Sequence, residues 1–171
     1  MSALVLTRRA ALAALGAFAL PSAIGVGSAL AQPPVRFRAI EVDVSRLRAN
    51  VGDPTAEWVQ QMLPGELARA LAPYMAPGDR NGATLVARID NLYLGPLSGG
   101  VEPGGSVPDQ IEGVVLVRGP RGAIAAETPL RATSSYYPMS VDQALVVQAL
   151  HNRVFELVQA FAGWVPKELS L

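Results

Sequence analysis

The stretch DQIEGVVLVRGPRGAIAAETPLRATS, residues 109–134, decides the fold. Residues 109–118 are typical of a strand, and residues 123–134 of a second strand that Pro129 weakens. The segment Gly119-Pro120-Arg121-Gly122 between them is typical of a turn. The stretch therefore predicts a β-hairpin.

Two further strands are predicted before this hairpin. Residues 83–94, ATLVARIDNLYL, form one of them, and residues 35–44, VRFRAIEVDV, form the first strand of the chain. Apolar and charged residues alternate after Ala39, but the apolar residues before it are in the opposite phase. This slip predicts a β-bulge near Ala39.

Two helices are predicted from apolar residues at helical spacing. The first begins at Asp53-Pro54 with Asp53 as its cap, and Pro64-Gly65 interrupts its pattern, which predicts a kink or two abutting helices. The second begins at a capping box formed by Ser140 and Gln143. It is expected to run to about Gly163, where Gly163-Trp164-Val165-Pro166 ends it.

The order of these elements is strand, helix, strand, strand, strand, helix. It predicts an α+β fold, a mainly antiparallel sheet with two helices on one face, because both apolar helix stripes are then buried. The helical crossover between the first two strands allows them to lie parallel in a right-handed unit.

Residues 1–31 have the three parts of a secretory signal. Arg8 and Arg9 precede an uncharged apolar run, and Ala29-Leu30-Ala31 has the small-x-small pattern of a cleavage site. We expect cleavage after Ala31, which leaves residues 32–171 as one mature domain; an uncleaved anchor is the alternative. Thr7-Arg8-Arg9 resembles the twin-arginine export signal, and the general secretory route is the alternative to it.

Composition limits the partners of the mature domain. The whole chain has 14 basic and 14 acidic residues, so loss of Arg8 and Arg9 leaves 12 against 14, a net charge of −2. No basic patch is visible, so we expect no nucleic-acid partner. There is no cysteine for a disulfide or for a lipid anchor at Gln32, so we expect a soluble periplasmic or secreted domain without a further membrane span.

The sequence contains no recognisable catalytic constellation, and we expect no metal and no cofactor. His151, the one histidine, has no evident nucleophile to serve and is interpreted as structural or at the surface. One histidine and no cysteine leave too few preferred ligands for zinc. Ser134 and Ser135 lack a Gly-x-Ser-x-Gly elbow, and Asp79-Arg80-Asn81-Gly82 is interpreted as a turn rather than a calcium site. Trp58 and Trp164 are interpreted as packing residues.

One connection stands out as a candidate for function. The segment GPLSGGVEPGGSVP, residues 95–108, contains five glycines and three prolines among its 14 residues and joins two strands that need only a short turn. Its glycine pairs are followed by neither a lysine nor a helix, so they do not form a phosphate loop. Leu97 and Val101 are apolar and Glu102 is charged, and we hypothesise that these residues contact a partner.

The arrangement of elements resembles a known group of exported domains. The resemblance lies in the first strand, the helix segment EWVQQMLP at residues 57–64 with Leu67 and Leu71, the hairpin and the closing helix. It is to small domains among the auxiliary lipoproteins of ABC-type transporters and related envelope-assembly lipoproteins. The resemblance implies a binding or assembly module without catalytic residues, and the absence of a lipobox cysteine is a departure from it.

We therefore rank three functions. The first is a non-catalytic accessory domain that binds a protein of the envelope or of a transport complex. The second is a protein that binds a small molecule or lipid between its helices and sheet, and the third is an enzyme.

Overall fold

The computed structural model describes residues 35–95, 108–134 and 145–171. The predicted signal at residues 1–31 and the capping box of Ser140 and Gln143 lie outside these ranges. Within them the chain forms, in order, β1 (Phe37–Asp43), α1 (Ser45–Val51), α2 (Thr55–Ala70), the short 3-10 helix η1 (Ala72–Tyr74), β2 (Ala83–Tyr93), β3 (Asp109–Arg118), β4 (Ile124–Ser134) and α3 (Val146–Glu168).

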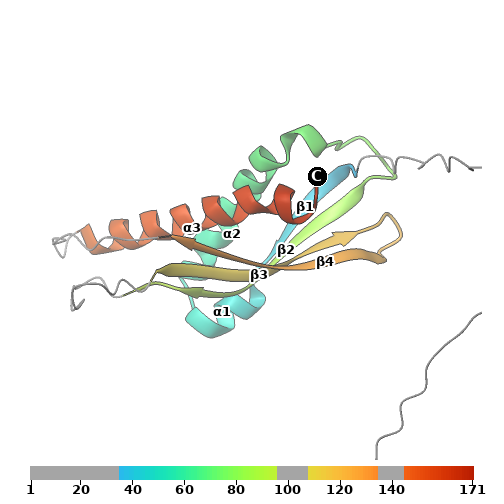
Figure 1. Cartoon of the computed structure of the whole chain (residues 1–171). Helices are drawn as coiled ribbons and strands as arrows, with labels where there is room; N and C mark the ends of the chain where they lie inside the picture. Colours follow the sequence, from blue (N-terminus) through green and yellow to red (C-terminus); the bar gives the residue numbers. More distant parts are fainter. Residues whose placement is uncertain (1–34, 96–107, 135–144) are drawn as a thin grey trace, which may run out of the picture. The chain divides into compact units, whose positions relative to one another are not determined.

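The four strands form one mixed sheet in the order β1-β2-β3-β4 (Figure 1). β1 is parallel to β2, as the helical crossover allows, and the other two pairs are antiparallel. The predicted hairpin joins β3 to β4, and its turn is closed by a hydrogen bond of 2.8 Å from the Gly119 N–H to the Ala123 carbonyl. Gly122 has a φ of 84° in this turn, a value that favours glycine.

Each of the first two strands contains a register slip. The register of β1 slips between Phe37 and Ala39, which confirms the bulge predicted there. A second slip occurs in β2 between Ile89 and Asn91, and a third occurs in the β3–β4 pair between Val117 and Arg118. Gly113 lies opposite Ile89, and a Cβ atom on it would approach the Arg88 carbonyl oxygen to 2.3 Å, so only glycine fits at this point.

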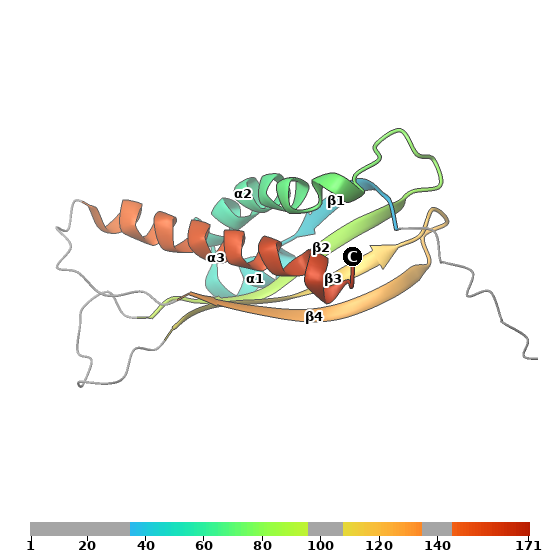
Figure 2. The same cartoon turned by 45° about the horizontal axis from the view of Figure 1, so that its top comes forward.

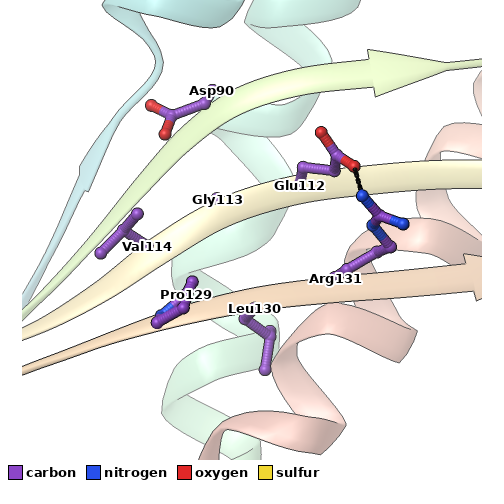
Figure 3. A pocket seen from close by; sticks show the side chains of 7 residues that line it. All are labelled: Asp90, Glu112, Gly113, Val114, Pro129, Leu130 and Arg131. Carbon is purple, nitrogen blue, oxygen red and sulfur yellow. Dashed lines mark ion pairs between the residues drawn. The ribbon is translucent and has the colours of Figure 1, made fainter.

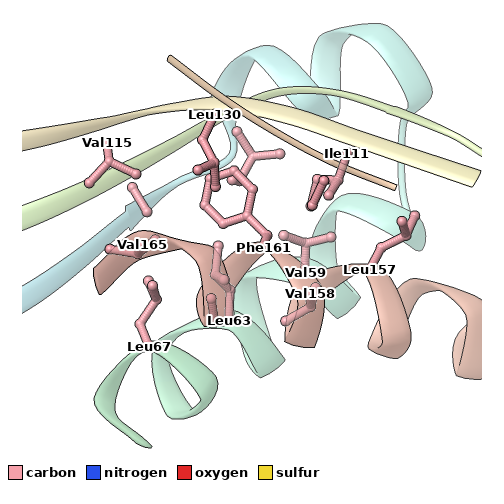
Figure 4. Close-up of a cluster of buried hydrophobic side chains, with 14 of the residues drawn as sticks. Val59, Leu63, Leu67, Ile111, Val115, Leu130, Leu157, Val158, Phe161 and Val165 are labelled. Carbon is pink, nitrogen blue, oxygen red and sulfur yellow. The ribbon is translucent and has the colours of Figure 1, made fainter. Parts of the chain in front are cut away.

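α2 and α3 lie side by side on one face of the sheet, and the core fills the space between them (Figure 2). Figure 4 shows Phe161 of α3 between the two layers, with Ile111, Val115 and Leu130 of the sheet on one side and side chains of α2 on the other. The alternation of β3 places every second residue, from Asp109 to Val117, in this buried layer. The α+β prediction with helices on one face of a mainly antiparallel sheet is confirmed.

The structure adds one short helix that the sequence did not predict. α1 follows β1 directly, and its Leu47 is fully buried in the core. Asp43 accepts a hydrogen bond of 2.9 Å from the N–H of Ser45, the first residue of α1. Hydrogen bonds from the side chain and the backbone of Ser45 lower the pKa of the Asp43 carboxyl group. The element order is therefore β-α-α-β-β-β-α.

α2 differs from its prediction at two points. It begins at Thr55 rather than with an Asp53 cap, because the Asp53 carboxylate accepts a hydrogen bond of 3.2 Å from Arg48 instead. It also continues through Pro64 as one helix, so the expectation of two abutting helices is wrong. The carbonyl that loses its helical partner to Pro64 belongs to Gln60, an exposed residue, and water can hydrate it.

α3 extends further than predicted. Its expected end at Gly163 is wrong, because the helix includes Pro166 and ends at Glu168. Val165 is fully buried, and its carbonyl accepts a hydrogen bond of 3.0 Å from Leu169. The burial of Val165 outweighs the local helix-ending preference of Gly163 and Pro166. None of the helices among the described residues combines the length and the hydropathy that crossing a lipid bilayer requires.

Candidate functional site

The start of β3 is joined to the first half of α3 by a buried ion pair. Arg153 projects from α3 and Asp109 from β3, and their side chains are 3% and 1% exposed. Arg153 Nε donates a hydrogen bond of 2.7 Å to Asp109 Oδ2, and Arg153 Nη2 donates to Oδ1. A guanidinium that meets a carboxylate through two nitrogens has a defined orientation, so this pair sets how α3 lies against β3.

The same pair holds the backbone of Gly95, just beyond the end of β2. The Gly95 N–H donates a hydrogen bond of 2.8 Å to Asp109 Oδ1, and the Gly95 carbonyl accepts one of 2.7 Å from Arg153 Nη2. We call these three residues the Arg153 clamp. Gly95 and Asp109 border the connection that the sequence singled out, so the clamp joins both of its ends to α3.

A second contact lies next to the clamp. Ser134, the last residue of β4, is paired with Asp109 in the sheet. Its hydroxyl lies 3.3 Å from Glu156 Oε2 on α3 and donates a hydrogen bond to it. The ends of β2, β3 and β4 are therefore all held at the same level of α3.

α3 continues beyond these strand ends. Figures 1 and 2 both show its first turns projecting past β3 and β4. We call residues 145–152 the α3 tip. Leu145 and Val147 on it are 58% and 65% exposed, although both are large apolar residues. The tip thus presents apolar surface next to a rigidly held set of strand ends.

His151 belongs to the α3 tip and contacts α2. Its ring centroid lies 5.2 Å from that of Trp58, and the two ring planes meet edge to face at 77°. Aromatic pairs prefer this geometry, so the contact fixes the tip against α2. The structure places no serine, lysine or carboxylate in a described hydrogen bond with His151.

The residues predicted to contact a partner, Leu97, Val101 and Glu102, lie outside the described residues. So do the signal residues Arg8, Arg9, Ala29 and Ala31, and Ser135.

Sequence reasoning missed Asp109 and Arg153. A signal for them exists, because Arg153 interrupts an apolar helix stripe next to Val154 and four residues before Leu157, and Asp109 is in phase with Ile111. A charge at a position whose periodicity predicts burial indicates a buried partner of opposite charge.

A shallow hollow of about 340 Å³ lies on the sheet face opposite α2 and α3 (Figure 3). Arg131 Nη2 lies 2.6 Å from Glu112 Oε1 in it, and Asp90 at its margin accepts a hydrogen bond of 2.8 Å from Arg88. The bond to Asp90 raises the pKa of Arg88. The residues that line the hollow are Asp90, Glu112, Gly113, Val114, Pro129, Leu130 and Arg131. Both carboxylates are thus paired with guanidinium groups, and the lining contains no nucleophile and no histidine.

The described residues also offer no cluster of three or more His, Cys, Asp or Glu side chains that could hold a metal ion.

Comparisons with known proteins found similarity to solved structures. No protein-family model matches the sequence, and no curated protein matches it either. Three solved structures are similar. A lipoprotein of Caulobacter crescentus is 12% identical, with 77% of this chain and 87% of that chain covered and a TM-score of 0.47. A minor lipoprotein of Acinetobacter baumannii is 14% identical, with 75% and 91% covered and a TM-score of 0.42.

The third similar structure is lipoprotein B of Nitrosomonas europaea, at 12% identity, with 80% of this chain and 86% of that chain covered and a TM-score of 0.31. The expected resemblance to small bacterial lipoproteins is therefore confirmed as a similarity of structure. It is a similarity at low sequence identity that assigns no function, and none of the three names mentions a transporter.

Proposed function

We propose that this chain is a non-catalytic accessory domain that binds a protein of the cell envelope through the α3 tip. The observation that carries the proposal is the exposure of Leu145 and Val147 directly beside the Arg153 clamp. Exposed apolar side chains on a helix that lacks a sheet beneath it are typical of a surface that another protein covers.

The Arg153 clamp supports this proposal. Removing two charges from water costs several kcal/mol for each ion, and apolar residues of similar volume often stabilise a protein as well or better. A buried ion pair is therefore poorly explained by stability alone. It does hold two strand ends and one helix in a single arrangement, and a preorganised surface lowers the entropic cost of binding.

A protein partner is favoured over a ligand enclosed between helices and sheet. In the described residues that space is filled by fully buried side chains of both layers, among them Leu63, Leu85, Ile111, Leu157 and Phe161. The hollow of Figure 3 lies on the other side of the sheet and is open to solvent.

The proposal includes export. The pattern of residues 1–31 supports a cleaved signal and a periplasmic or secreted mature domain. The lack of a cysteine at position 32 supports a mature domain without a lipid anchor.

Site-specific crosslinking tests this function. A photo-crosslinking amino acid replaces Val147, and in a matched control it replaces Ile124, which is 60% exposed at the far end of the β3–β4 hairpin. Covalent adducts with one envelope protein are expected from position 147 and not from position 124. Equal adducts from both positions, or none from position 147 in cells that contain the whole envelope, would contradict the proposal.

A further inference from the structure

A second hollow, of about 280 Å³, lies between the outer edge of β4 and the last turns of α3. Its lining residues are Pro129, Leu130, Arg131, Trp164 and Glu168. Trp164 comes 17 residues after Val147, which corresponds to ~26 Å along a helix, so this hollow is separate from the α3 tip. Its volume is just below the range for ligand sites, about 300–1,000 Å³, and suits a single ring.

Trp164 is the largest apolar residue in the lining of this hollow. It is 44% exposed, although tryptophan is among the residues that gain most from burial. Lys167 Nζ lies 4.3 Å from the centre of its indole, and this cation–π contact holds the ring in place. Lys167 covers one face of the ring, so a ligand in the hollow meets the other face or the ring edge.

Two groups of opposite charge stand at the rim. The guanidinium of Arg131 is held by its ion pair with Glu112 on the sheet face away from α3 (Figure 3), and its side chain, 66% exposed, borders this hollow across the edge strand β4. Glu168 supplies a carboxylate from α3. Glu168 would repel an anion, and Arg131 would repel a cation. The two charges therefore favour a neutral ligand that both accepts and donates hydrogen bonds.

We propose that this hollow binds a neutral sugar ring. The C–H face of the ring packs on Trp164 and Pro129, and its hydroxyl groups accept hydrogen bonds from Arg131 and donate them to Glu168. Sugars combine an apolar face with a rim of hydroxyl groups, which is the combination that the hollow offers. This site is independent of the protein-binding surface proposed above.

The competing occupant is an extended peptide that adds a strand to β4. Two features oppose it. Pro129 has no N–H to donate, and the register of the hairpin slips between Val117 and Arg118, which places a bulge near the start of β4. Prolines and bulges are the devices by which edge strands avoid pairing.

The chain's two tryptophans allow a direct test. In a Trp58→Phe background Trp164 is the single tryptophan, and its fluorescence is excited selectively over that of the four tyrosines. N-acetylglucosamine, maltose, cellobiose and a proline-free peptide of β-branched residues are titrated separately, and indole fluorescence and the indole N–H signal in NMR are followed. At least one sugar is expected to saturate, with a dissociation constant on the order of 1 mM for so few atoms at an open site.

Variants then assign the contacts. Glu168→Gln and Arg131→Ala should each weaken sugar binding about fivefold or more, whereas Gln159→Ala, on an exposed part of α3 outside the hollow, should leave it unchanged. The proposal is overturned if no sugar saturates at concentrations tenfold above the expected constant. It is equally overturned if the peptide saturates while the sugars do not, or if the rim variants bind as tightly as the parent.

Discussion

Arg153 and Asp109 lie 44 residues apart in the sequence and form a buried ion pair that also holds the backbone of Gly95. The pair joins α3 to the ends of β2 and β3. Both side chains are almost completely buried, so neither charge is hydrated by water. Each charge is stabilised in the interior by the opposite charge of the other side chain.

Arg153→Met should destabilise the domain by about 3–5 kcal/mol, because it leaves the Asp109 carboxylate buried without its cation. Urea unfolding followed by circular dichroism measures the loss. The double variant Asp109→Leu/Arg153→Met removes both charges and should be more stable than Arg153→Met alone. If the double variant is as unstable as the single one, the charge of Asp109 is not the cause.

Gly113→Ala should cost about 1–3 kcal/mol, because the new methyl group meets the Arg88 carbonyl oxygen at the β2 bulge and forces the strands apart. Gly163→Ala is the matched control. Nothing lies within 4 Å of a Cβ atom at this helical position, so it should stabilise the domain by about 0.5–1 kcal/mol. Thermal unfolding compares the two, and similar effects would refute the steric explanation.

Asp43→Asn should destabilise the domain at neutral pH but not at low pH. The folded-state pKa of Asp43 is lowered from 3.8, so its charged form contributes stability above the unfolded pKa, and this contribution is lost as the pH falls through the folded pKa. Urea unfolding of both proteins from pH 7 to about pH 2 gives the difference. A difference that does not shrink below pH 3.8 would show that the Asp43 charge is not responsible.

His151→Ala should lower stability by about 1 kcal/mol through loss of the edge-to-face contact with Trp58. His151→Phe keeps an aromatic ring and should recover most of the loss. Partner capture should survive in both variants if His151 has only a packing role. Loss of capture in a folded His151→Phe protein would assign the imidazole a functional part.

Replacement of both Arg8 and Arg9 by lysine should leave the precursor in the cytoplasm if export uses the twin-arginine route. Fractionation and mass spectrometry of the N-terminus measure the outcome, with Gln32 expected as the first residue of the wild-type exported protein. Normal export of the double variant would indicate the general secretory route.

The sequence by itself determined most of the secondary structure. The bounds of β3 agree with the prediction at both ends, and the bulge near Ala39 was visible as a slip in phase. These features are local, because alternation in a strand and glycine in a turn follow from a few neighbouring residues. The sequence also indicated that β1 and β2 could pair in parallel, because a helical crossover permits this arrangement.

Only the tertiary structure decided the rest. Local signals end α3 at Gly163, but the burial of Val165 carries the helix on to Glu168, and α1 forms around the fully buried Leu47 although it is too short to be stable alone. The partnership of Arg153 with Asp109 depends on two elements meeting that are distant in the sequence. Burial and charge pairing are set by which elements pack together, and no local pattern of residues contains that information.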